Sequence, residues 1–117
     1  MLAILDSGKA LPVHYSYPIQ AWRFGSSLKF IALGGEVVSD YCLRLKQQYG
    51  FDDTWVTGYS NDVFGYVGSR RVIQEGGYEG GDANTNFPGP FSTAAEEIII
   101  EKTGELMRQL IAAGGSK

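Results

Sequence analysis

The strongest constraint on the fold lies between Phe30 and Gly50, where the hydrophobic period changes once. The apolar stretch FIAL is followed by two glycines and Glu36. From Glu36 the apolar residues recur at spacings of three and four up to Gly50, which indicates an amphipathic helix. These apolar residues are Val38, Tyr41, Cys42, Leu45 and Tyr49. A strand joined to a helix through a Gly-Gly turn is typical of α/β proteins.

The flanking segments extend this pattern. YPIQAWRF and LKFIAL, joined by GSS, predict a β-hairpin because both are rich in aromatic and β-branched residues. TWVTGYS predicts another strand, and SRRVIQEGG predicts a short helix with Ser69 as its N-cap and Gly76-Gly77 as its stop. We therefore expect an α/β fold, a partial mixed sheet with helices packed on it, in a single unit that spans residues 1–117.

Three other stretches lead to more local expectations. MLAILDSG resembles the last turns of a helix closed by Gly8. GGYEGGDANTNFPGPF is too rich in glycine, proline and asparagine for regular structure, so it predicts a long loop. Thr93 and Glu96 predict a capping box for a last helix. The apolar face expected for that helix contains Ile99, Thr103, Leu106 and Leu110.

Composition excludes several classes of function. The chain has 10 Lys and Arg against 13 Asp and Glu, and no basic run that could neutralise a row of phosphates, so we expect no nucleic-acid partner. Its single cysteine and single histidine exclude an internal disulfide and an ordinary zinc site made of Cys and His alone. The short apolar runs predict no membrane span, and the start lacks the basic flank of a signal peptide, which leaves the cellular location open.

Polar residues follow two of the predicted strands. Glu36 is expected on the first turn of its helix and at the carboxyl end of a strand, while Asn61, Asp62 and Tyr66 follow the next strand. Ligands of open α/β sheets bind at that edge. Simpler explanations remain open, because Glu36 could only cap the helix, Asn61 and Asp62 are common turn formers, and Tyr66 and Tyr78 could be half-buried aromatics.

Three separated blocks of the sequence resemble a known family. LGGEVVSDYCLRLK, then WVTGYSNDVFGYVGSRRVIQEGGYEGG, then FPGPF before a helix occur in one order. Together they resemble the later part of the catalytic domain of neutral/alkaline ceramidases, especially the bacterial ceramidase-like branch. The resemblance covers nearly the whole chain from about Leu11 onward. It implies a fragment of a larger catalytic domain whose full-length relatives are often secreted or extracytoplasmic.

The family's chemistry implies roles for three residues. Family members are zinc amidases that cleave the N-acyl bond of ceramide, so the implied cofactor is zinc and the implied partner is a ceramide-like or other N-acyl lipid. By position in the motifs, Glu36 and Tyr66 correspond to zinc ligands, and Tyr78 corresponds to a tyrosine that lines the active site close to the scissile amide. The family's histidine ligands and its functional serine lie upstream and are not in this chain.

Two hypotheses about function follow. In the first, the chain is part of a zinc-dependent amidohydrolase and is inactive alone, because Glu36 and Tyr66 offer only two oxygens to a metal. In the second, it is a non-catalytic α/β binding or interaction module that retains the scaffold. If the chain is a fragment, we expect exposed, unpaired sheet edges where the rest of the domain would pack, so that the chain self-associates or has low stability.

Overall fold

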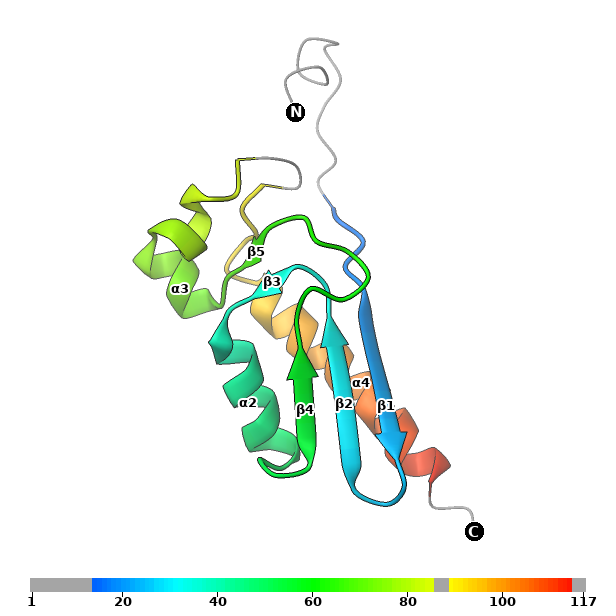
Figure 1. Cartoon of the computed structure of the whole chain (residues 1–117). Helices are drawn as coiled ribbons and strands as arrows, with labels where there is room; N and C mark the ends of the chain where they lie inside the picture. Colours follow the sequence, from blue (N-terminus) through cyan, green and yellow to red (C-terminus); the bar gives the residue numbers. More distant parts are fainter. Residues whose placement is uncertain (1–13, 86–88, 115–117) are drawn as a thin grey trace.

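The computed structural model describes residues 14–85 and 89–114, and it places helices against a small mixed sheet (Figure 1). The sheet has the order β1 (Ile19–Phe24), β2 (Leu28–Leu33) and β4 (Thr54–Thr57). β1 and β2 form an antiparallel hairpin, and β4 runs parallel to β2. The α/β class, the hairpin and the third strand are therefore confirmed. The helix end expected at MLAILDSG lies outside the described residues.

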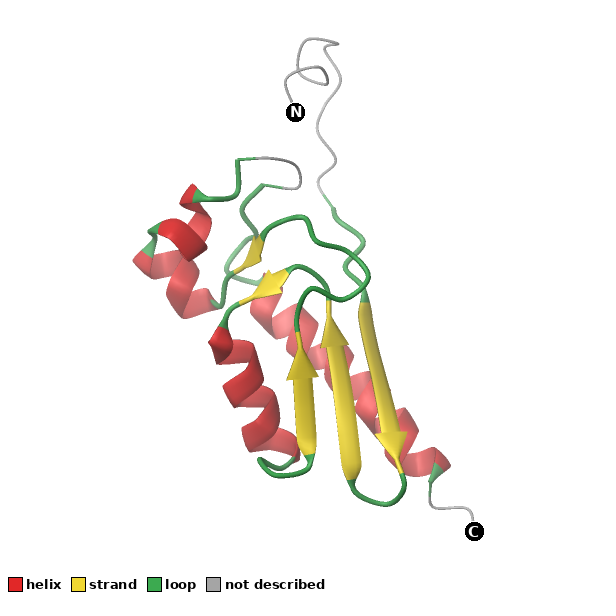
Figure 2. Cartoon of the chain, in the orientation of Figure 1, coloured by secondary structure: helices red, strands yellow, loops and turns green. Residues whose placement is uncertain are grey.

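A second, two-stranded ladder continues beyond the carboxyl ends of β2 and β4. It pairs β3 (Glu36–Val37) with β5 (Tyr66–Val67) in parallel. Figure 2 shows this short ladder above the three-stranded sheet, at the ends to which the β2 and β4 arrows point. The polar segments after the two parallel strands therefore meet at one edge, as expected for parallel strands.

Four helical segments complete the described chain. They are α2 (Ser39–Tyr49), α3 (Arg70–Glu75), the short turn η1 (Tyr78–Asp82) and α4 (Ala95–Ala113). α2 packs along β4, and α4 crosses behind β1 and also contacts α2 (Figure 1). No helix among the described residues is long and apolar enough to cross a membrane.

The hydrophobic core lies between one face of the sheet and the two long helices. β2, β5, α2 and α4 contribute its fully or nearly fully buried side chains. They are Ile31 and Leu33 of β2, Tyr41 and Leu45 of α2, Val67 of β5, and Ile99, Ile100 and Met107 of α4. On α4, Ile99 and Thr103 are buried as expected, while Leu106 and Leu110 are only partly buried. The helix therefore presents a slightly rotated face to the sheet.

The opposite face of the sheet carries exposed aromatic side chains. Trp22, Phe30 and Trp55 occupy one row across the three strands, because Trp22 pairs with Phe30 and Phe30 pairs with Trp55. Trp22 is 40% exposed, and Trp55 and Phe24 are each 57% exposed. Within the part of the chain that the structure describes, the helices therefore cover one face of the sheet only.

The expectation that Glu36 begins a helix was wrong. α2 begins at Ser39, and Glu36 belongs to β3. The backbone N–H of Glu36 donates to Gly65 O at 2.8 Å, and that of Val38 donates to Val67 O at 3.3 Å. These ladder bonds hold residues 36–38 in an extended conformation, which β-branched valines favour.

Two further local expectations were also wrong. α4 begins at Ala95 after Ala94, and no side chain caps it, so the capping box of Thr93 and Glu96 does not form. Instead, Glu96 accepts hydrogen bonds from Arg44 and from the backbone N–H of Arg70. The glycine-rich loop contains the turn η1, which i to i+5 hydrogen bonds close. The short helix capped by Ser69 and ended by Gly76 is confirmed.

The core predicts a stability difference between two leucines of α2. Leu45 is fully buried, whereas Leu43 is 56% exposed. We expect Leu45→Ala to lower the free energy of unfolding by about 2–5 kcal/mol, since it leaves a cavity. The matched control Leu43→Ala should change it by less than about 0.5 kcal/mol. Chemical denaturation followed by circular dichroism measures both values, and equal effects would contradict the assigned core.

Candidate functional site

The candidate site is built on the β3–β5 ladder. Glu36 and Tyr66 are register partners in this parallel pair, so their side chains lie on the same face. Asn84 fixes Tyr66 from the other side, because its amide accepts from Tyr66 N and donates to Tyr66 O, each at 2.9 Å. The ladder thus brings together a carboxylate and a phenol that are far apart in the sequence.

The charge of Glu36 affects the ionisation of two tyrosines, Tyr66 and Tyr59. A hydrogen bond to the Glu36 carboxylate, with some desolvation, raises the pKa of Tyr66 to about 12. A hydrogen bond to the same carboxylate is also the main cause that raises the pKa of Tyr59. The negative charge of the Glu36 carboxylate therefore disfavours ionisation of both phenols.

Tyr78 stands beside this pair. Its ring packs edge-on against that of Tyr66, with 5.5 Å between the ring centroids and 71° between the planes. Tyr78 opens the turn η1 and is 65% exposed. The three residues expected at the site, Glu36, Tyr66 and Tyr78, are thus neighbours in the structure, and the Tyr78 hydroxyl is accessible to a ligand.

The structure explains why a glycine, Gly35, precedes Glu36. Gly35 has φ of +66°, and a Cβ there would lie 2.8 Å from both Phe64 Cζ and Val67 Cγ2. A side chain at this position would therefore clash with the loop and strand that carry Tyr66. The close approach that the Gly-Gly turn permits is made by this chain's own β5 segment.

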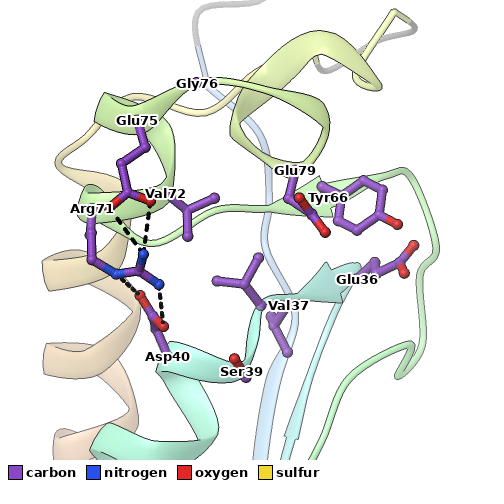
Figure 3. A pocket seen from close by; sticks show the side chains of 11 residues that line it. Glu36, Val37, Ser39, Asp40, Tyr66, Arg71, Val72, Glu75, Gly76 and Glu79 are labelled. Atoms are coloured by element: carbon purple, nitrogen blue, oxygen red, sulfur yellow. Dashed lines mark hydrogen bonds and ion pairs between the residues drawn. The ribbon is translucent and has the colours of Figure 1, made fainter.

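A polar cavity of about 460 Å³ lies next to the ladder (Figure 3). At one end Arg71 donates to Asp40 and to Glu75, with N–O distances of 3.0 and 2.8 Å. At the other end Figure 3 shows Glu36 and Glu79 near Tyr66. Arg71 is thus already paired, which leaves two carboxylates and the Tyr66 phenol to face a ligand at the Tyr66 end of the cavity.

The donor set fits a metal only in part. A carboxylate and a phenol are oxygen ligands, and a phenol binds as phenolate only beside a strong positive charge. Zinc sites use at least three protein ligands. Among residues 14–85 and 89–114 no group of three or more His, Cys, Asp or Glu side chains could hold a metal ion. Glu36 and Tyr66 are therefore compatible with part of a zinc site, to which other donors would have to be added.

The remaining polar residues near the site have structural partners. Asn61 has φ of +67° and donates to Gln20 at 2.7 Å, and Asp62 accepts a hydrogen bond from Tyr15. This agrees with turn formation rather than chemistry for both residues. Tyr59, whose pKa the Glu36 carboxylate raises, was not among the residues expected at the site. Its position directly after a strand, within GYSND, could have drawn attention to it.

Comparisons of the chain with protein-family models, with curated proteins and with solved structures gave no match. The resemblance to the ceramidase family therefore depends on the three sequence blocks.

The contact between Glu36 and Tyr66 predicts a change in tyrosine ionisation. Glu36→Gln removes the negative charge that opposes phenolate formation, so the pKa of Tyr66 should fall from about 12 towards about 10. Ultraviolet difference titration of the variant, with Tyr66→Phe to assign the signal, measures this shift. Glu79→Gln is the matched control, and an equal shift there would contradict a specific contact with Glu36.

The Asp40 network predicts a pH-dependent stability. Hydrogen bonds from Arg71 and Ser69 hold the pKa of the Asp40 carboxyl below its ordinary value. The resulting stabilisation is complete above the unfolded pKa of about 4 and is lost as the pH falls through the lower folded value. Asp40→Asn should therefore lower the free energy of unfolding by about 1 kcal/mol at neutral pH and by less in acid.

Urea denaturation of this variant at several pH values measures the effect. Asp52→Asn, at an exposed position, is the matched control. A loss in Asp40→Asn that is equal at neutral and acidic pH would contradict a contribution from the ionised carboxylate.

Proposed function

We propose that this chain supplies part of the metal site of a zinc-dependent amidohydrolase that resembles neutral ceramidase. The observation that carries the proposal is the register pair of Glu36 and Tyr66, which places a carboxylate and a phenol on one face of a parallel ladder beyond the carboxyl ends of β2 and β4. A cap for a helix would not need this pairing, and Glu36 does not belong to a helix. The resemblance assigns zinc ligands to the same two residues.

In this proposal the two oxygen donors act as a unit. Glu36 contributes a carboxylate oxygen, and Tyr66 contributes its phenol oxygen after its proton has passed to solvent. Zinc bound there would polarise the amide carbonyl and lower the pKa of a bound water. Tyr78, accessible and packed against Tyr66, would donate a hydrogen bond to the reacting amide. The substrate class is an N-acyl lipid such as ceramide.

The proposal requires further donors. The chain contains one histidine, and family zinc sites use several, so we expect no hydrolysis of ceramide or of a simple N-acyl amide by these 117 residues alone. A second polypeptide segment would have to provide the histidines. In-frame coding sequence upstream of Met1 with histidine-containing motifs would support this reading.

A binding module is the alternative. The polar cavity beside Arg71 favours it, because a cavity of about 460 Å³ could hold a small polar ligand without any metal. The two functions differ in their dependence on Glu36 and Tyr66. Ligand binding that needs Arg71 but neither of those residues would favour the module.

The decisive experiment is a zinc titration of the chain, by calorimetry and by ultraviolet difference absorption. We expect weak binding of one zinc ion with a tyrosinate signal, because Tyr66 loses its proton on coordination. Glu36→Gln and Tyr66→Phe should each remove the binding, and Glu101→Gln, an exposed carboxylate on α4, should not. Binding that both site variants retain would overturn the zinc assignment.

Self-association is a second consequence that we propose. β1 and β4 each pair on one side only within the described part of the three-stranded sheet. Unpaired strand edges can add strands from another copy. We expect sedimentation velocity to show an average mass that rises with protein concentration, and a monomer at all concentrations would contradict this.

A further inference from the structure

The face of the three-stranded sheet opposite the helices carries five large apolar side chains side by side. Trp22, Phe30 and Trp55 form one row across the strands. Phe24 and Leu28 form the next row, towards the turn between β1 and β2. Because side chains two residues apart along a strand share a face, both rows belong to one surface, which we call the aromatic patch. The Trp22 and Phe30 rings pack together, with 5.6 Å between their centroids.

The chain's own loop after β4 covers the other end of this face. Asn61 of the loop donates to the Gln20 side chain at 2.7 Å. Figure 1 shows the loop in front of the sheet, on the side opposite α4. Ala32, which projects from the same face as Phe30, is buried at this end. The aromatic patch lies beyond the loop and is in contact with solvent.

The aromatic patch is flat and carries no charged side chain. The two basic residues of β1 and β2, Arg23 and Lys29, project from the opposite face. The cavity near Glu36 and a second one beside Pro18 are lined by residues outside the patch. A flat surface does not enclose a small ligand, which binds in a concave site. It fits a second flat sheet, because sheets pack face to face about 10 Å apart.

We propose that the aromatic patch is an interface between two copies of this chain, which pack sheet against sheet about a two-fold axis. A second copy presents the same flat apolar surface, and a two-fold interface uses one patch on both subunits. Although each copy has a net charge of -3, no like charges meet across this patch. The inference goes beyond the proposed metal site and does not depend on it.

The size of the patch determines how strong this association is. The exposed parts of Trp22, Phe24 and Trp55 amount to roughly 300 Å², since such a side chain buries about 150–250 Å² in full. Stable interfaces bury about 800 Å² from each partner. We therefore expect a weak dimer in equilibrium with the monomer, populated at high protein concentration.

The test measures sedimentation velocity and tryptophan emission over the same range of protein concentrations. Trp22 and Trp55 are the two tryptophans of the chain, so the emission reports burial of the patch. We expect the average mass to rise towards that of a dimer while the emission shifts to shorter wavelengths in step.

Two matched variants locate the interface, and circular dichroism checks that both fold. Phe24→Lys keeps both indoles and brings two like charges together across the two-fold axis, so it should weaken the association more than about tenfold. Leu43→Lys, at a similarly exposed leucine of α2, should leave the association unchanged. An emission shift that both variants remove equally would overturn the inference.

The emission also separates this interface from pairing of strand edges, which leaves the patch exposed. A mass that rises with no emission shift would assign self-association to the edges of β1 and β4 and overturn the inference. A monomer with constant emission at every concentration would overturn it too. An emission shift that appears only when phosphatidylcholine vesicles are added would assign the patch to a lipid surface instead.

Discussion

The arrangement of the site depends on the short parallel pairing of β3 with β5. Only two residues from each strand take part, yet this pairing places Glu36 opposite Tyr66 and Val37 opposite Val67. Val67 is fully buried and belongs to the hydrophobic core. In this ladder Val37 and Val67 pack among apolar side chains, while Glu36 and Tyr66 point to the other face. The packing of the two valines therefore fixes the position of Glu36 relative to Tyr66.

The approach of the two strands requires space that side chains would fill. Gly35 provides it on the β3 side, because a Cβ there would clash with Phe64 and Val67. Phe64 in turn packs in a cluster with Tyr15, Tyr17 and Phe91. The position of Glu36 thus depends on a layer of aromatic rings above the sheet edge. A change in that layer could alter the site without touching any of its polar residues.

Much of the fold could be predicted from the sequence, because its signals are local. The hairpin, the strand at Thr54–Thr57 and the helix capped by Ser69 follow from residue type and turn chemistry. The starts of α2 and α4 could not be predicted. Glu36 lies in a strand and not in α2 because its N–H donates to Gly65 O. Glu96 does not cap α4 because its carboxylate accepts a hydrogen bond from Arg44 of the neighbouring α2. Such tertiary contacts cannot be predicted from the local pattern of residue types.

The proximity of the candidate site residues was predictable to a similar degree. Parallel strands carry their carboxyl ends to one edge, so the meeting of Glu36 and Tyr66 followed once the strands were assigned. The packing of Tyr78 on Tyr66 depends on the turn η1, and the backbone hydrogen bond from Tyr59 to Gly35 depends on a left-handed backbone angle. Neither feature can be derived from spacing, because each is set by the path of a glycine-containing loop.

The uncovered aromatic face has a consequence for spectroscopy. The chain has two tryptophans, Trp22 and Trp55, and both lie on that face in contact with solvent. Indole emission therefore reports the environment of one sheet surface and little of the helix-packed core. Unfolding would expose both indoles further and shift this emission to longer wavelengths, whereas any molecule that covered the sheet would shift it to shorter wavelengths. The direction of the shift thus distinguishes docking on this face from unfolding of the chain.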